Sequence, residues 1–181
     1  MTNKIIFSLS ICLISILQSY PAPIHTAAVN GERAAIASEL QKGVDVNLPI
    51  KKRAPQEGFT PLALAIIEQQ YDTTKFLVEN NADVNSPMPY GEAEGYSPLF
   101  LTVPITDKKY TELLLSKGAN VNARISLGHA KGFTPLYIAT QEGREETVSF
   151  LIDNRPDVNL RGFKNSTALI FAAENGQLKA T

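Results

Sequence analysis

A short phrase recurs along this chain at a nearly fixed interval, and this repetition constrains the fold more than any other feature. The phrase reads GFTPL from Gly58, GYSPL from Gly95 and GFTPL from Gly132, with a weaker form, NSTAL, from Asn165. The first three starts are 37 residues apart, and the last interval is 33 residues. A fixed period of this length is typical of stacked repeat proteins, in which each unit buries its apolar face against its neighbours.

The proline of the phrase predicts where the first helix of each unit begins. Proline is tolerated at the first helical position, because its missing N–H would have no intrahelical partner there and its fixed φ suits a helix. The residue before each helix carries a hydroxyl that can accept a hydrogen bond from the first turn. The predicted N-caps are Thr60, Ser97, Thr134 and Thr167.

A second phrase keeps the same period and predicts the end of the second helix. It reads VDVN, ADVN, ANVN and PDVN at 44–47, 82–85, 119–122 and 156–159, each time after an apolar stretch. The residue before each phrase is mostly of a type that tolerates the left-handed conformation after a helix. These residues are Gly43, Asn81, Gly118 and Arg155. The predicted core comprises Leu62, Leu99, Leu136, Phe76, Leu77, Leu113, Leu114, Phe150 and Leu151.

The two phrases together resemble the ankyrin repeat family, over a region that runs from about Pro23 to the last residue. The resemblance implies an all-α solenoid of helix-turn-helix units joined by extended, β-hairpin-like fingers. The predicted units are 20–47, 48–85, 86–122, 123–159 and a partial fifth unit, 160–181. The first unit keeps the family's histidine as His25, whereas the others replace it with Ala63, Phe100, Tyr137 and Ile170.

Pro104 interrupts the pattern late in the first helix of the third unit. Inside a helix its ring would clash with the carbonyl of Phe100, at a cost of about 3 kcal/mol. We therefore expect this helix to kink or to end early.

The first 19 residues have a different character. They combine a lysine at position 4, an apolar run from Ile5 to Leu17 and a polar patch before Pro21. This layout is typical of a secretory signal peptide, and the run is too short to span a bilayer comfortably. We predict a signal peptide at residues 1–19, cleaved after Ser19, with Ala22 as the second choice.

Two other interpretations of this segment fit less well. A buried first helix of the solenoid would need a polar face, which the segment lacks. A lipid anchor on Cys12 would need a small residue at Ile11, and the apolar run continues past the cysteine. After cleavage the chain would hold no cysteine, so it would need no disulfide. We also expect no stable membrane anchor once the signal is removed.

The resemblance and the signal peptide together imply a location. Ankyrin solenoids of eukaryotes are overwhelmingly intracellular, so a cleaved signal favours a bacterial protein that is periplasmic or secreted. In a secreted eukaryotic protein the sequence NST at 165–167 would be an N-glycosylation sequon, but Thr167 is better explained as an N-cap.

Catalytic and metal-binding patterns are missing from the sequence. The two histidines, His25 and His129, are 104 positions apart, and we find neither a zinc-ligand spacing nor a phosphate-binding glycine loop. We therefore expect no enzyme activity, no cofactor and no metal. The 17 basic and 18 acidic residues give a net charge of −1, which provides no overall attraction to nucleic acid.

The connectors between units are unusually long. Segments 48–57, 86–94 and 123–131 exceed the family's usual connector of about five residues, and only 160–164 has that length. Loops lengthened at one site in successive repeats usually lie on the binding face. Their charges run basic, acidic and basic, which suits a protein surface better than nucleic acid. The candidate contact residues are Lys51, Lys52, Arg53, Met88, Tyr90, Glu92, Glu94, Arg124, Ile125, Leu127, His129 and Lys131.

These observations favour an exported, monomeric, non-catalytic protein that binds a partner protein through its fingers and concave face. One alternative is a binder that acts outside the producing cell, as a host-directed effector or a toxin-neutralising protein. A second alternative is an enzyme or small-ligand protein whose site has no recognisable pattern. A deep pocket with converging polar groups would favour the second alternative.

Export is directly testable. If residues 1–19 are a signal peptide, the mature N-terminus will be Tyr20, or Pro23 after the second-choice cleavage. Amino-terminal sequencing of exported protein decides between them. An intact Met1 on soluble protein from the cytoplasm would contradict the prediction.

Overall fold

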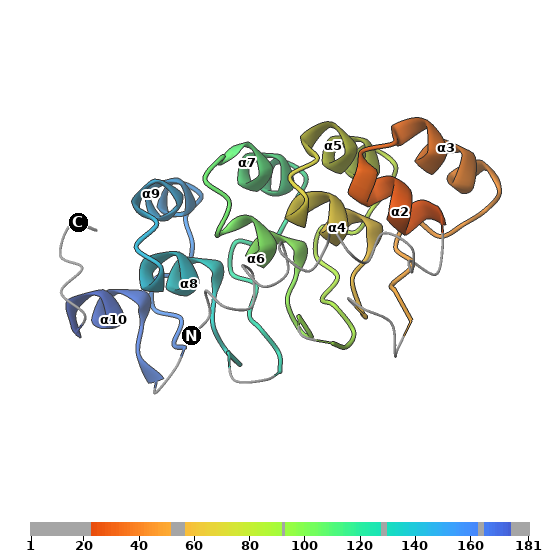
Figure 1. Ribbon diagram of the computed structural model, residues 1–181. Helices are drawn as coiled ribbons and strands as arrows, with labels where there is room; N and C mark the ends of the chain where they lie inside the picture. Colours follow the sequence, from red (N-terminus) through yellow and green to blue (C-terminus); the bar gives the residue numbers. More distant parts are fainter. Residues whose placement is uncertain (1–22, 52–56, 92, 128–129, 163–164, 175–181) are drawn as a thin grey trace.

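Two layers of short helices make up the fold (Figure 1). The computed structural model describes residues 23–51, 57–91, 93–127, 130–162 and 165–174, and no strand occurs among them. The inner layer consists of α2 (Pro23–Asn30), α4 (Pro61–Ile67), α6 (Pro98–Thr102), α8 (Pro135–Gln141) and α10 (Ala168–Glu174). The outer layer consists of α3 (Arg33–Gln41), α5 (Tyr71–Glu79), α7 (Lys109–Ser116) and α9 (Glu145–Asp153). The prediction of an all-α solenoid is confirmed.

The starts of the inner helices follow the predicted capping, with one exception. The hydroxyl of Thr60 accepts a hydrogen bond from the Ala63 amide at 3.2 Å, and that of Thr134 accepts one from the Tyr137 amide at 3.1 Å. Ser97 has the same extended backbone, with φ −81° and ψ 162°, but its hydroxyl makes no capping bond. The Ser97 Oγ is buried and finds no hydrogen-bond partner among the described residues. The predicted cap at Ser97 is therefore wrong, and helix α6 lacks its stabilisation.

The ends of the outer helices match the sequence pattern. The second residue after each one adopts a positive φ, which lets the chain turn away from the helix. The values are 83° at Gly43, 67° at Asn81, 86° at Gly118 and 53° at Arg155. All four predicted left-handed positions are confirmed.

Helix α6 is cut short, as Pro104 predicts. It ends at Thr102 after five residues, whereas α4 and α8 each have seven. Proline has no N–H to continue the ladder of hydrogen bonds, and it disfavours helical backbone in the residue before it.

The core forms between the layers and between successive units. Seven of the predicted core leucines are buried: Leu62, Leu77, Leu99, Leu113, Leu114, Leu136 and Leu151. Phe76 and Phe150 are only partly buried. Three finger residues that were not expected in the core, Ile50, Met88 and Ile125, are at most 1% exposed.

Asparagine side chains connect the VDVN-type phrases of neighbouring units. The side-chain oxygen of Asn47 accepts a hydrogen bond from the Asp83 amide at 2.8 Å. Asn85 and Asn122 accept equivalent bonds from the next unit, at 2.8 and 2.7 Å. Since each of these side chains satisfies a main-chain donor of the following loop, the asparagines hold the units in register.

The last helix exposes apolar side chains that earlier units bury. Leu169 is 66% exposed and Ile170 is 41% exposed. Their counterparts one repeat earlier, Leu136 and Tyr137, are 6% and 1% exposed because α10 packs on α8.

The predicted signal peptide lies outside the described residues. Within the described part of the chain, every helix is too short or too polar to cross a bilayer.

Two leucine substitutions test whether stability comes from packing between units. Leu114 is fully buried, so Leu114→Ala should lower the free energy of unfolding by about 2–5 kcal/mol. Leu169→Ala makes the same chemical change at an exposed position and should cost no more than about 0.5 kcal/mol. Denaturant unfolding of both variants measures the difference. Equal costs would mean that another surface covers Leu169.

Candidate functional site

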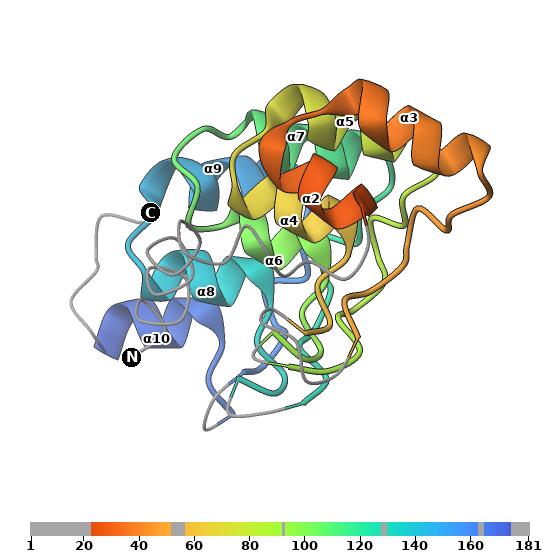
Figure 2. The same ribbon diagram turned by 45° about the vertical axis from the view of Figure 1, so that its right-hand side comes forward.

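The described parts of four connectors, which we call fingers, project from the same side of the stack, below the inner helices in Figure 1, and Figure 2 shows them from a second direction. We define finger 1 as 48–57, finger 2 as 86–94, finger 3 as 123–131 and finger 4 as 160–164. Each finger links a VDVN-type phrase to the next inner helix. We call the side formed by the fingers and the inner helices the concave face.

A pair of backbone hydrogen bonds closes the base of each long finger. In finger 1 the Ile50 amide donates to the Phe59 carbonyl, and the Gly58 amide donates back to Ile50, both at 2.9 Å. In finger 2 the Met88 amide donates to the Tyr96 carbonyl, and the Gly95 amide donates to the Met88 carbonyl. In finger 3 the Ile125 amide donates to the Phe133 carbonyl, and the Gly132 amide donates to the Ile125 carbonyl. The fingers are therefore hairpin-like only at their bases, among the residues that the structure describes.

Two of the predicted contact residues are not available at the surface. Met88 and Ile125 are each 1% exposed, and each occupies the paired position at the base of its finger. Successive side chains of an extended segment point to opposite faces, so this position directs its side chain toward the inner helices. Met88 and Ile125 are core residues, and the expectation that their side chains are exposed on the fingers is wrong.

Glycines bring fingers 1 and 2 into direct backbone contact. A β-carbon on Gly58 would overlap the carbonyl oxygen of Tyr90, and one on Gly91 would overlap that of Glu57. Both glycines also have a positive φ, 84° and 89°, which most other residues avoid. Fingers 1 and 2 are therefore stacked on each other.

The stack of fingers continues toward the C-terminal end of the chain. A β-carbon on Gly95 would lie 2.8 Å from the Ser126 hydroxyl and 3.1 Å from the Leu127 amide, so the base of finger 2 touches finger 3. The Arg124 guanidinium donates a hydrogen bond to the Arg161 carbonyl at 2.8 Å, which joins finger 3 to finger 4. The described parts of the four fingers therefore form one continuous surface.

The remaining predicted residues divide by their position. Lys51, Glu94, Arg124 and Lys131 are exposed, and Tyr90 is half-buried. Leu127 is 48% exposed, the highest value among the predicted apolar contact residues. Lys52, Arg53, Glu92 and His129 lie outside the described residues. The structure thus presents a basic side chain on finger 1, an acidic one on finger 2 and basic ones on finger 3.

Two partly buried carboxylates were missed by sequence reasoning. Glu68 follows α4 and Glu142 follows α8, at the same position of their repeats. Burial raises the pKa of both carboxyls above the usual value, and the nearby Arg144 partly offsets the shift at Glu142. Burial and the charge of Glu142 also raise the pKa of the Tyr96 phenol. Only the shared register of Glu68 and Glu142 could have drawn attention to them.

The described residues show no catalytic or metal-binding arrangement. His25 is 1% exposed, and its Nε2 lies 2.7 Å from the Leu48 carbonyl oxygen, which ties the first inner helix to finger 1. No three histidine, cysteine or acidic side chains of the described segments lie close enough to hold a metal ion.

A matched pair of glycine substitutions tests the stacking of the fingers. Gly43 has a φ of 83°, and a β-carbon there would meet nothing within 4 Å, so Gly43→Ala should cost only the backbone penalty of about 1–2 kcal/mol. Gly58→Ala has the same penalty plus the clash with Tyr90, for an additional cost of about 1–3 kcal/mol. Denaturant unfolding of the two variants compares them. Equal losses would show that fingers 1 and 2 do not depend on each other.

Comparison with known proteins agrees with the architecture. The sequence model of the family described as ankyrin repeats (3 copies) matches residues 8–88, 88–162 and 107–181. No curated protein matches the chain. The matches cover far more than half of the sequence, and the helix pairs, the capped inner helices and the fingers follow the same period. The chain belongs to the ankyrin repeat family.

Proposed function

We propose that this chain is a non-catalytic module that binds a partner protein through its fingers and its concave face. Ankyrin repeats suggest a protein–protein interaction module, and the family is typically non-catalytic. The observation that carries the proposal is the contact between fingers through Gly58, Gly91 and Gly95. Because the fingers support one another, they offer a partner a surface that is already ordered, and less entropy is lost on binding.

The exposed side chains of this surface favour a partner of mixed charge. Lys51 on finger 1 and Lys131 on finger 3 lie on either side of finger 2, which carries Glu94. Alternating charge of this kind provides orientation and on-rate more than raw affinity. Leu127 and the half-buried Tyr90 add apolar contact area between the charges, and tyrosine is enriched at protein interfaces.

We also propose that the chain is exported from the cytoplasm. The lysine, the apolar run and the polar patch of residues 1–19 support a signal peptide, and so a periplasmic or secreted protein. The lack of cysteine after residue 12 fits an oxidising compartment, since folding then requires no disulfide.

Finger variants of the exported chain test the binding surface. The wild-type chain is first used to capture proteins from the cell-envelope fraction of the producing cell, and the captured proteins are identified. The association and dissociation rate constants of the purified partner are then measured for each variant. Joint charge reversal at Lys51, Lys52 and Arg53 should slow association in a salt-dependent way. Leu127→Ala should instead speed dissociation, because buried contact area is lost. Neither change should alter the unfolding midpoint.

The matched control lies on the outer layer. Lys75→Glu on α5 reverses a charge of the same kind at an exposed position remote from the fingers, and it should leave both rate constants unchanged. The proposal is wrong if Lys75→Glu abolishes binding while the finger variants bind with wild-type kinetics.

A further inference from the structure

The inner helices carry large apolar side chains on two opposite sides. Residues two positions apart in an α-helix point in directions about 200° apart, so Leu101 lies on the side of α6 opposite Leu99. Thr102, three positions after Leu99, shares the side of Leu99. Its hydroxyl accepts a hydrogen bond from the Thr111 hydroxyl of α7 at 2.8 Å. Leu99 therefore faces the outer layer, and Leu101 faces the concave side.

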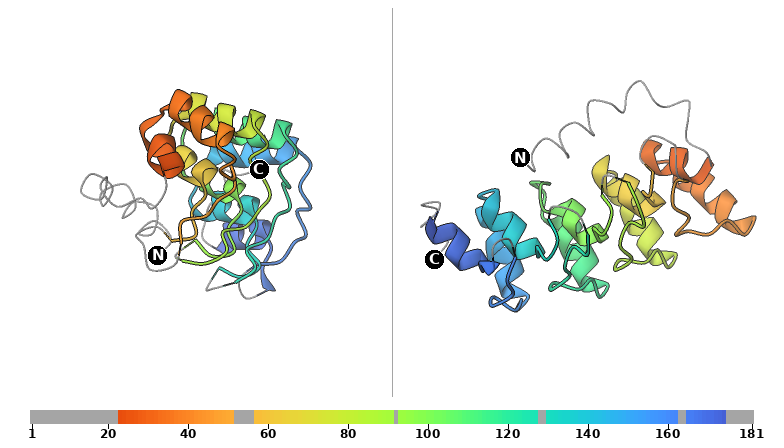
Figure 3. Two further views of the ribbon diagram at one scale, coloured as in Figure 1. Left: turned by 90° about the vertical axis from the view of Figure 1, so that its right-hand side faces the viewer. Right: turned by 90° about the horizontal axis from the view of Figure 1, so that it is seen from below.

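The position of Leu101 is apolar in three successive units, and we call this row the concave stripe. It consists of Leu64 on α4, Leu101 on α6 and Ile138 on α8, which are 1%, 5% and 4% exposed. The described helices pack mainly on inner neighbours, on outer neighbours or on the other helix of their own unit. Figure 3 shows no described helix on the concave side of the inner layer. The low exposure of the stripe therefore points to a cover from elsewhere in the chain.

A carboxylate lies at one end of the concave stripe. Glu142 follows α8 with helical backbone, four residues after Ile138, and residues four apart share one side of a helix. Its side chain is 6% exposed, and neither carboxylate oxygen has a hydrogen-bond partner within the described segments.

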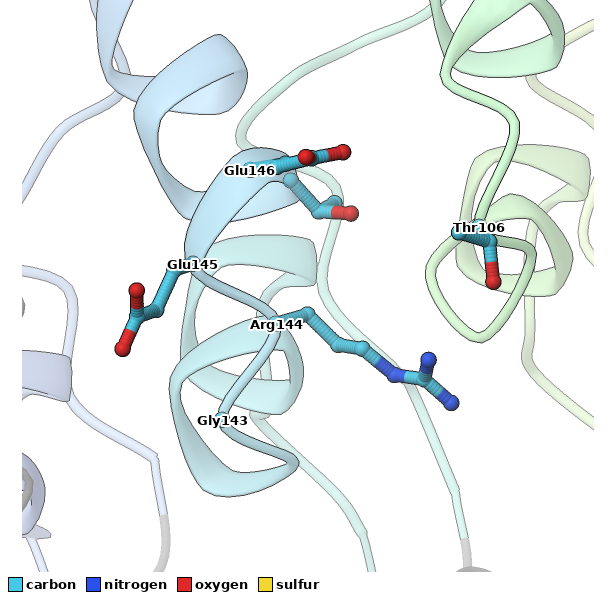
Figure 4. Close-up of a pocket in the computed structure, with 6 residues that line it drawn as sticks. Thr106, Gly143, Arg144, Glu145 and Glu146 are labelled. Carbon is cyan, nitrogen blue, oxygen red and sulfur yellow. The ribbon is translucent and has the colours of Figure 1, made fainter.

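The neighbouring arginine satisfies this carboxylate poorly. The Arg144 Nε lies 3.7 Å from the Glu142 carboxylate, too far for a good hydrogen bond. Figure 4 shows the Arg144 side chain extending from the start of α9 toward Thr106, across a hollow of about 260 Å³. Since a buried carboxylate is costly without a partner, Glu142 favours a second cation beside it.

The segment before α2 has the length and the composition to cover this surface. It is apolar from Ile5 to Leu17, with Lys4 immediately before the run. In a helix that rises 1.5 Å per residue, the 18 steps from residue 22 to Lys4 span about 27 Å. Packed helices lie about 8–10 Å apart, so the three steps from α2 to α8 cover about 24–30 Å. A segment that leaves α2 along the concave side therefore brings Lys4 to the helix that ends at Glu142.

The other residues outside the described ranges fit this surface less well. Four of these ranges belong to the fingers: 52–56, 92, 128–129 and 163–164. The last, 175–181, follows α10 and contains one large apolar side chain, Leu178. Neither set offers an apolar run that matches three units.

We propose that the N-terminal segment, residues 1–22, docks on the concave stripe as long as it stays attached, with Lys4 beside Glu142. The apolar run and the stripe then remove each other's surface from water, and the charge pair sets the direction of the segment. Removal of the segment exposes the stripe. The docking does not depend on the proposed partner binding; together, the two mean that cleavage uncovers the concave face for a partner.

Cysteine cross-linking in the uncleaved full chain, synthesised without membranes, tests the docking. Cys12 is the only cysteine of the sequence, so one added cysteine defines each pair. Ile67→Cys lies three positions after Leu64 on α4, and Lys75→Cys lies on α5, in the outer layer of the same unit. A short bismaleimide should link positions 12 and 67 within one chain and leave 12 and 75 unlinked, as read by peptide mass spectrometry.

Three results would overturn the docking. They are equal linking at 67 and 75, no link at 67, and links that join only two different chains. The cleaved chain and its partner do not enter this experiment, so the docking and the partner binding can fail separately.

A charge exchange tests the direction of the segment. Lys4→Glu places a second carboxylate beside Glu142 and should lower the yield of the 12–67 link roughly two- to fivefold. The double variant Lys4→Glu/Glu142→Lys restores opposite charges and should restore the yield. The proposed pairing is wrong if Lys4→Glu leaves the yield unchanged, or if the double variant unfolds at the wild-type midpoint without recovering the link.

Discussion

Burial of the inner helices between neighbouring units is the interaction on which the rest of this structure depends. Leu62, Leu99 and Leu136 occupy the same position in three units and are 1%, 1% and 6% exposed, whereas Leu169 in the last described unit is 66% exposed. The residue type is identical, so the difference lies in whether a further unit is packed beside it. A unit of this length is too small to form a core alone, and its stability comes largely from its neighbours.

Local signals in the sequence predicted the helix boundaries well, because they act through one or two residues. The left-handed position at Gly43 and the hydroxyl cap at Thr60 need no knowledge of the tertiary structure. The role of Met88 could not be derived in the same way, since the sequence of an extended segment does not say which face meets the helices. Comparison of registers would have helped, because Ile50, Met88 and Ile125 are all apolar at the same position.

The candidate surface was predicted only in outline. Connector length indicated that the fingers project from one side, but not that Gly58 and Gly91 bring their backbones together. Each of these glycines adopts a positive φ and lies against the backbone of the neighbouring finger. Only the positive φ can be predicted from the sequence. The buried carboxylate of Glu142 could not be predicted from the sequence either, because its burial depends on which side chains meet in the folded chain.

The central claim is that the stacked fingers form the surface that meets a partner. Hydrogen exchange of the chain, free and saturated with its purified partner, measures this most directly. The account predicts that exchange slows on binding at the backbone amides of the fingers, around Lys51, Glu94 and Leu127, and is unchanged in α5 and α9. Protection confined to the outer helices, with the fingers exchanging as in the free chain, would contradict it.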